Sequence, residues 1–519
     1  MTRKRITLLK AEPKRTNVYS AFAYPGLALP VIGTTLAQRG YDVRIYVEAV
    51  RPWDWSRIAD SDLIGMTVNS AEVKECYALA DEIRSRTRAP IVMGGYHVTY
   101  LDGDALDHCD YVVRGEGEAT MAELADELLH GARRVDAIAG ITYRRDGEIV
   151  RNPDRPLIEN IDLIPDQSLI QGYREYHRRW FQKIFPVGAL VAWSRGCPYD
   201  CTFCSIIEIY RRSTRFRSPE AVIEDIRQQT RLTGRPYVFF ADDNFTAHLR
   251  KCKELLRHVI DAKLNLRFSA QVRLEFSKDE EFIRLMKEAG CYMVFIGLES
   301  INPQTLLDFK KKQTVDDIIY CVERLHRARL HVHGMFVLGA DSDDANTVRE
   351  TARFAVDKQL DTAQFLPLYP LPGTQQTAQL ERERRLFLTL NAATGRYDVD
   401  YGVGNFVLFQ TKGINPLELQ RELLAAYETF YSRRTILTAI ARRSSLQTIV
   451  AKLVAWRLLQ IGRREAQTHV DWLVRHGFTK DWSEFVRSTP QVQPVVEPAA
   501  VPLSLASRAS ASSAAMSVP

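Results

Sequence analysis

The sequence is poor in the features that mark secreted and membrane-spanning proteins. Only eight of its 519 residues are cysteine, too few for a fold stapled by disulfides. No run reaches the roughly 18 apolar residues of a transmembrane helix. The charged start of the chain also lacks the apolar stretch of a signal peptide. We therefore expect a reduced, cytoplasmic protein without a membrane span.

A strong net charge is also missing. Seventy Lys and Arg residues against 64 Asp and Glu leave a net charge of +6. That excess is too small to indicate nucleic-acid binding, so no nucleic-acid partner is expected. The 45% hydrophobic content allows ordinary cores, and the length predicts more than one domain.

Three cysteines stand close together, Cys197, Cys201 and Cys204, after an apolar, strand-like stretch. A structural zinc site would need a fourth Cys or His nearby, and the next histidine is His248. Three thiolates suit a [4Fe–4S] cluster instead, which would keep one iron free to bind a small molecule. The other five cysteines are scattered singly and are expected to be small buried hydrophobes.

Residues 187–385 alternate strand-like and helical patterns in six units. This pattern predicts a partial (β/α)6 barrel of the TIM type, in which polar residues at the carboxyl ends of strands are functional positions. The residues in question are Asp242, Asp243, Gln271, Arg273, Glu299 and Gly339.

Residues 1–145 show a similar alternation, typical of a parallel sheet with helices on both faces. Small and polar residues cluster where three of its strands end, at the edge where such sheets bind ligands. Glycines there would let a large planar ligand approach the backbone. A nicotinamide cofactor is disfavoured because no G-x-G-x-x-G follows the first strand. The cluster comprises Thr67, Asn69, Ser70, Gly94, Gly95, Tyr96, His97, Gly115, Glu116 and Gly117.

The cysteine run resembles the signature of the radical S-adenosylmethionine (SAM) enzymes. Together with the preceding unit it resembles the B12-dependent branch of that superfamily, through residues 63–67, 94–97 and 113–118. Residues 242–245 and 334–339 look like its anaerobic magnesium-protoporphyrin-cyclase-like subgroup. One departure is the absence of the D-x-H-x-x-G motif, whose histidine binds cobalt in many cobalamin proteins. The cobalamin assignment therefore rests on fold and loops, and His97 is expected to be a loop histidine.

This resemblance implies an α/β protein with a flavodoxin-type, Rossmann-like cobalamin-binding domain ahead of a radical SAM barrel. The implied boundaries are 1–145 for the first domain, 146–186 for a proline-interrupted linker, 187–385 for the barrel, 386–489 for a mostly helical region and 490–519 for a disordered tail. The implied cofactors are a [4Fe–4S] cluster on the three cysteines, SAM, and a cobalamin against the cluster of small and polar residues in the first domain.

The resemblance also distributes roles around SAM. Glu299 and Gln271 would accept hydrogen bonds from the ribose, and Asp242 or Asp243 from the amino group. Phe203 and Gly339 would face adenine. Arg273 would neutralise the SAM carboxylate or pair with Glu299. No residue is assigned to direct hydrogen transfer.

The implied activity is methylation of an unactivated carbon in a small metabolite, for example a hydrophobic one such as a terpenoid, lipid or tetrapyrrole. An external electron donor such as flavodoxin or ferredoxin would reduce the cluster. Cobalamin-assisted oxidation or ring closure, and a non-catalytic iron–sulfur sensor, remain alternatives. A methylthiolating enzyme is less favoured because the first domain lacks cysteines for a second cluster.

The C-terminal region has two interpretations. Residues 436–464 are apolar with interspersed arginines, which fits peripheral membrane contact through basic helices. The same pattern fits a helical cap on the barrel with a basic outer face, and the sequence favours this second interpretation. Residues 490–519 are rich in Pro, Ala and Ser and almost free of charge, which predicts disorder.

Overall fold

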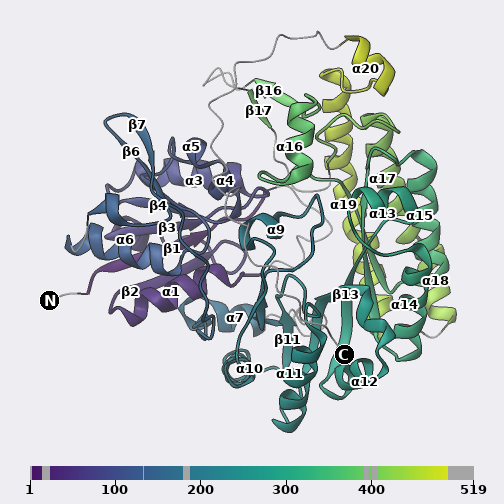
Figure 1. Ribbon diagram of the computed structural model, residues 1–519, viewed down its shortest axis with the longest axis horizontal. Helices are drawn as coiled ribbons and strands as arrows, with labels where there is room; N and C mark the ends of the chain where they lie inside the picture. The colour runs from purple at the N-terminus through teal and green to yellow at the C-terminus, as the bar shows by residue number, and fades with distance from the viewer. Residues whose placement is uncertain are drawn as a thin grey trace, which may run out of the picture.

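The computed structural model describes residues 3–14, 24–131, 134–178, 188–390, 397–399, 406–442 and 444–488. The predicted disordered tail lies outside these residues. Two α/β units stand side by side, and α9 (Ser205–Tyr210) lies between them (Figure 1). None of the helices in the described ranges is both long and apolar enough to cross a membrane.

The first unit is a seven-stranded sheet with the order β2-β1-β3-β4-β5-β6-β7. Its first five strands are parallel in the order 2-1-3-4-5, the flavodoxin order that the sequence predicts. An antiparallel hairpin extends the sheet past residue 145. The strands are β1 (Arg5–Lys10), β2 (Asp42–Val47), β3 (Leu63–Thr67), β4 (Ile91–Gly94), β5 (Tyr111–Val113), β6 (Ile141–Arg145) and β7 (Glu148–Arg151).

Helices cover both faces of this sheet, and each face has its own apolar core. Leu36 of α1 and Leu124 of α6 are buried in one core, and Cys76 and Ile83 of α3 in the other. Apolar side chains on both sides of a strand explain why β3 is buried at every position. The helices of this unit are α1 (Ala28–Gln38), α2 (Trp55–Ala59), α3 (Val73–Arg84), α4 (Tyr96–Tyr100), α5 (Asp102–Ala105) and α6 (Glu118–His130).

The second unit is a six-stranded, all-parallel sheet in sequential order, the predicted partial barrel. Its strands are β8 (Ala189–Val191), β11 (Tyr237–Phe240), β12 (Arg267–Val272), β13 (Cys291–Glu299), β14 (His331–Leu338) and β15 (Thr362–Pro367). Its helices are α10 (Pro219–Thr233), α11 (Leu249–Asp261), α12 (Glu280–Glu288), α13 (Pro303–Asp308), α14 (Val315–Arg327) and α15 (Ala345–Asp357). Amphipathic helices bury one face each in a single core with these strands.

Smaller elements join and extend the two units. A linker with α7 (Tyr173–Arg178) connects them, and Gln167 of this linker donates a hydrogen bond to the Leu190 carbonyl of β8 at 2.7 Å. A two-stranded pair, β9 (Ser194–Arg195) with β10 (Arg215–Phe216), flanks the cysteine loop. After α16 (Gln375–Arg382), a short antiparallel pair occurs where no strands were expected, β16 (Leu388–Leu390) with β17 (Tyr397–Val399).

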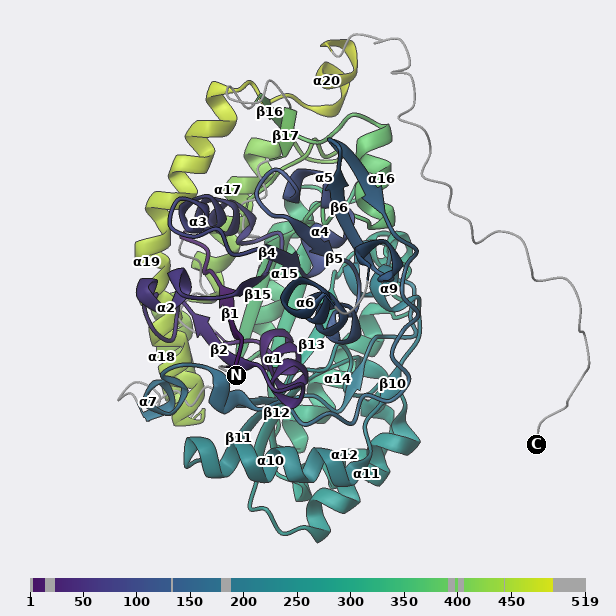
Figure 2. The ribbon, with the colours of Figure 1, turned by 90° about the vertical axis from the view of Figure 1, so that its left-hand side faces the viewer.

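The rest of the C-terminal region is helical, as predicted. Its helices are α17 (Pro416–Phe430), α18 (Arg433–Ala441), α19 (Leu446–Arg475) and α20 (Trp482–Ser488). Residues 436–464 are divided between α18 and α19, because the Ser445 side chain accepts a hydrogen bond from the Thr448 amide and begins a new helix. In Figure 2, α19 runs along one edge of the molecule from the level of α18 towards α20.

Candidate active site

The cysteine loop lies at the carboxyl end of the barrel and is fixed by the loop that follows β11. Asp242 is almost fully buried, and its carboxylate accepts hydrogen bonds from the Ser194 amide and hydroxyl, both at 2.5 Å. Asp243 accepts one from the Gly196 amide at 2.8 Å. Burial raises the pKa of the Asp242 carboxyl to about 7. These two carboxylates hold the backbone just ahead of Cys197.

The three cysteines are free thiols on this loop, as expected for cluster ligands. Burial raises the pKa of the Cys204 thiol to about 12, so the binding of iron would have to displace its proton. In the described part of the chain, no three His, Cys, Asp or Glu side chains converge closely enough to hold one metal ion. The three thiols fit a cluster in which each thiolate ligates a different iron.

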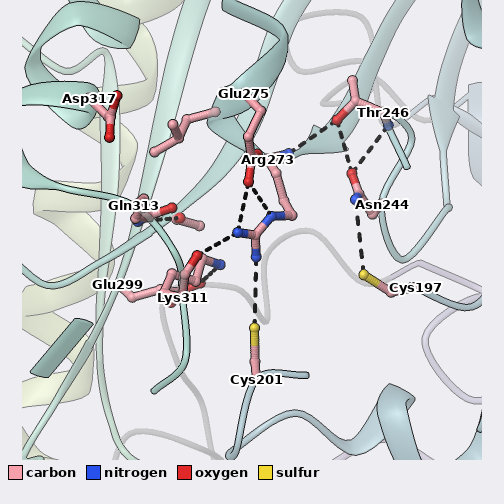
Figure 3. A network of polar contacts seen from close by, with 12 residues as sticks. Cys197, Cys201, Asn244, Thr246, Arg273, Glu275, Glu299, Lys311, Gln313 and Asp317 are labelled. Carbon is pink, nitrogen blue, oxygen red and sulfur yellow. Dashed lines mark hydrogen bonds and ion pairs between the residues drawn. The ribbon is translucent and has the colours of Figure 1, made fainter. Parts of the chain in front are cut away.

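Two side chains that donate hydrogen bonds point at these sulfur atoms (Figure 3). Arg273 Nη1 lies 3.7 Å from Cys201 Sγ, and Asn244 Nδ2 lies 4.0 Å from Cys197 Sγ. Sequence reasoning missed Asn244 as an individual residue, although it stands in the Asp-Asp-Asn-Phe segment that carried part of the resemblance. N–H groups directed at sulfur stabilise the extra electron of a reduced cluster.

Arg273 has three partners besides Cys201. Its guanidinium donates hydrogen bonds to Glu275 Oε1 at 2.9 and 3.0 Å and to the Lys311 carbonyl at 2.6 Å, and it stacks 3.7 Å above the Tyr199 ring. The alternative that Arg273 pairs with Glu299 is wrong, because Glu275 takes that place. Arg273 is therefore a rigidly held cation beside the cysteine loop, where its charge can affect the cluster or an anionic ligand next to it.

We expect an Arg273→Met substitution to lower the reduction potential of the bound cluster by about 60 mV, the shift that corresponds to a tenfold change in a one-electron equilibrium. The reason is the loss of both a positive charge and an N–H directed at Cys201. A redox titration followed by electron paramagnetic resonance measures it, and Arg273→Lys, which keeps the charge, is the control. An unchanged potential in Arg273→Met would contradict this role.

Glu299, at the end of β13, forms a buried ion pair with Lys311. Their Nζ and Oε1 atoms are 2.6 Å apart, and both side chains are less than one-tenth exposed. Glu299 has a φ of 63°, a left-handed conformation that is uncommon for a non-glycine residue. Gly297 makes the space, since a Cβ there would lie 2.3 Å from Glu299 Oε1. Sequence reasoning found Glu299 and missed its partner.

The remaining predicted SAM residues are spread around this edge. Gln271 is half-buried near the end of β12, and Phe203 packs against Phe309 with ring centroids 4.8 Å apart. Gly339 follows β14 with a φ of 94°, and the place of its missing Cβ is occupied by Leu419 of α17. The lack of a side chain at Gly339 therefore lets the C-terminal helix α17 pack against it. This packing is independent of any contact that the Gly339 backbone makes with a ligand.

The polar residues predicted in the first domain gather at one edge of its sheet, which faces the barrel. Gly95 has a φ of 112°, and a Cβ there would lie 2.7 Å from the Val68 carbonyl, so only glycine fits. Next to it, Tyr96 donates a hydrogen bond to the Pro372 carbonyl of the barrel. Asn69 and Gly115 are exposed at the same edge, and Thr67 and Gly94 end their strands there. Exposed backbone between two facing loop edges suits a large planar group such as a corrin.

His97 and Ser70 are buried together at this edge, with His97 Nδ1 3.0 Å from Ser70 Oγ. Burial lowers the pKa of the His97 imidazole to about 4, so it is neutral at neutral pH. This pairing ties the loops after β3 and β4 to each other.

Glu116 joins the two units. Its carboxylate accepts hydrogen bonds from Arg195 at 2.9 Å, from Arg215 at 2.7 Å and from the Ile158 amide at 2.7 Å. Burial alone would raise the pKa of this carboxyl, but the three hydrogen bonds outweigh it and lower the pKa below its usual value. Gly117, the next residue, packs against Ile32 and Val113. Since Arg195 is two residues before Cys197, Glu116 fixes the first domain directly to the cysteine loop.

A flavodoxin-type domain facing a partial barrel, with three free thiols between them, defines an iron–sulfur enzyme that uses a second, large cofactor. Residues 191–355 match the radical SAM superfamily, and residues 17–125 match the B12-binding domain. The chain belongs to the B12-dependent radical SAM methyltransferase family. Its cofactors are a [4Fe–4S] cluster, SAM and cobalamin, and the residues described above fit all three.

Two relatives and one solved structure illustrate this membership. An uncharacterized methyltransferase of Pyrococcus horikoshii is 30% identical over 80% of this chain and 89% of its own length. The bacteriochlorophyllide d C-12(1)-methyltransferase of Chlorobaculum tepidum is 25% identical over 69% of this chain and 74% of its own. The radical SAM methyltransferase TsrM from Kitasatospora setae, solved with cobalamin and a [4Fe–4S] cluster, has the same fold with a TM-score of 0.68. It is 19% identical, and the match covers 89% of this chain and all of that chain.

Proposed function

We propose that this protein methylates an unactivated carbon of a hydrophobic small molecule of the tetrapyrrole, terpenoid or lipid class. The observation that carries the proposal is the meeting of the cysteine loop and the glycine-rich edge of the first domain at one interface, tied by Glu116 and Arg195. A substrate bound at this interface can then present one carbon both to a radical and to a methyl donor. The activity of the Chlorobaculum relative on a tetrapyrrole supports that substrate class.

In this proposal each cofactor has its own set of residues. Cys197, Cys201 and Cys204 ligate the cluster, Glu299 and Gln271 bind SAM, and Arg273 and Asn244 tune the cluster from behind. When bound, the cluster and SAM supply the 5′-deoxyadenosyl radical that removes a hydrogen atom, and cobalamin supplies the methyl group. The chain's own part is to hold these groups in fixed positions and to exclude water. The cobalamin contacts are Thr67, Asn69, Gly94, Gly95, Tyr96 and Gly115.

The test is an anaerobic turnover assay on the reconstituted holoprotein. It contains SAM with a deuterated methyl group, a one-electron reductant, and either a chlorin or a pentacyclic triterpene as acceptor. We expect 5′-deoxyadenosine and S-adenosylhomocysteine in equal amounts, together with a product that carries the label, because one SAM supplies the radical and another the methyl group. Mass spectrometry measures all three.

The other outcomes separate the alternatives. Formation of 5′-deoxyadenosine with an altered but unlabelled product would indicate an oxidation or ring closure. No 5′-deoxyadenosine from an intact cluster would indicate an iron–sulfur sensor. We also propose that an acidic carrier protein such as flavodoxin or ferredoxin supplies the electron, and its replacement of the chemical reductant tests this.

A further inference from the structure

The pair of helices α18 and α19 carries apolar side chains that the fold leaves uncovered. Eight large hydrophobic side chains are exposed among the residues that the structure describes, and four of them fall within residues 437–453. We call these four the α18–α19 patch: Leu437, Ile440, Leu446 and Leu453, with exposed fractions of 65%, 50%, 76% and 43%.

Helical spacing places these residues on the outer faces of their helices. Leu437 and Ile440 are three residues apart on α18, and Leu446 and Leu453 are seven apart on α19, so each pair shares a face. The two helices pack against each other, which brings the pairs into one region. Large apolar side chains that are exposed together in one region of a protein surface indicate an interaction site.

The opposite faces of both helices are anchored to the barrel. Thr448 donates a hydrogen bond to Asp361 at 2.6 Å, and Lys452 Nζ lies 3.7 Å from the centroid of the Phe430 ring. Ile436 and Ala439 of α18 are buried. With these contacts in place the helices cannot rotate to bury the patch. The inner faces cap the barrel, and the outer faces remain free for a partner.

The segment that carries the patch holds charge of only one sign. Residues 433–464 contain seven arginines and one lysine and no acidic residue. Arg433, Arg434, Arg442 and Arg457 are exposed, and Arg457 follows Leu453 by one helical turn. Among the described residues, Asp361 accepts a hydrogen bond from Thr448 of this segment, and Glu428 pairs with Arg463 at 2.8 Å. The patch is therefore an apolar surface with a cationic rim.

We propose that the α18–α19 patch docks this protein on the surface of an anionic lipid bilayer. Leucine and isoleucine side chains would enter the boundary of the acyl chains, and the arginines would contact lipid phosphates, the arrangement of an interfacial amphipathic helix. The inference goes beyond the proposed methylation and does not depend on it, although a hydrophobic substrate would be at hand on such a surface.

The experiment is cosedimentation of the full-length holoprotein with vesicles of phosphatidylcholine, with and without phosphatidylglycerol. We expect binding to the anionic vesicles that high salt weakens. A variant with Leu437→Gln, Ile440→Gln, Leu446→Gln and Leu453→Gln should bind at least about tenfold more weakly, because its apolar contacts are lost. The matched control replaces the other four exposed hydrophobic residues, Leu307, Tyr320, Val474 and Val486, with Gln and should bind like the wild type.

A second variant tests the rim and guards against misfolding of the first. Arg434→Gln with Arg442→Gln and Arg457→Gln should lose about fivefold in affinity per arginine for anionic vesicles. Three results would overturn the proposal: equal binding of the wild type to neutral and anionic vesicles or to neither, wild-type binding by the patch variant, and a lipid-free dimer that the patch variant cannot form. The last result would assign the patch to a second copy of the chain.

Discussion

A Cys201→Ala protein is expected to lose the iron–sulfur cluster and with it all formation of 5′-deoxyadenosine. Three thiolates are the fewest that can hold the cluster and still leave one iron open for SAM. Cys201 is buried and faces Arg273, so solvent or a neighbouring side chain cannot take its place. Iron analysis, the visible absorbance of the reconstituted protein, and chromatography of the SAM cleavage products measure the effect.

The loop itself should survive the substitution. Asp242 and Asp243 hold its start, and the Gln376 amide donates a hydrogen bond to the Thr202 carbonyl at 3.0 Å. Cys321→Ala is the matched control, since it removes a buried thiol from α14 of the same barrel. A Cys201→Ala protein that still bound four irons and cleaved SAM would show that the ligands lie elsewhere.

Removal of Lys311 should strongly destabilise the barrel. Lys311→Met leaves the Glu299 carboxylate buried without its partner, which costs about 3 to 5 kcal/mol. For a unit of this size the apparent melting temperature should fall by roughly 10 °C. Calorimetry or circular dichroism of the protein without cofactors measures the shift. Lys278→Met, which breaks an exposed pair with Asp317, should change the melting temperature little.

A double substitution separates the contribution of the ion pair to stability from the contribution of Glu299 to SAM binding. Glu299→Gln combined with Lys311→Met removes both charges, so most of the stability should return. SAM affinity should not return, because the proposed ribose acceptor is still missing, and we expect a loss of about tenfold from one hydrogen bond to a charged group. If Lys311→Met melted at the wild-type temperature, the ion pair would not be a structural element.

The fold was predictable from the sequence because its signals are local and repeated. Apolar runs such as residues 63–67 alternate with amphipathic helices, and this periodicity forces parallel sheets covered on both faces. The strand pair β16–β17 was not predictable in this way, because it is short and its partners are not set by any periodic pattern. The break between α18 and α19 depends on one capping serine, a signal that apolar spacing hides.

The site was predictable in part. The cysteine spacing and the residues at strand ends pointed to one edge of the barrel, and the structure brings them together there because parallel strands have their carboxyl ends at the same edge. The sequence did not show which side chains pair with one another at that edge. Lys311 lies twelve residues after Glu299, in a segment whose basic residues look alike, and only the fold turns Lys311 inwards. Likewise, nothing in the sequence of residues 115–117 shows that the Glu116 carboxylate accepts hydrogen bonds from two arginines of another domain.

The contact of Glu116 with Arg195 and Arg215 limits which first domains can be exchanged between members of this family. A first domain transplanted from a relative would bring its own residue at position 116, while the recipient barrel would keep both arginines. If the incoming residue were not acidic, Arg215 would lose its acidic partner and Arg195 would keep only Glu118. Functional chimeras should therefore inherit all three positions together, and natural sequences should vary them together.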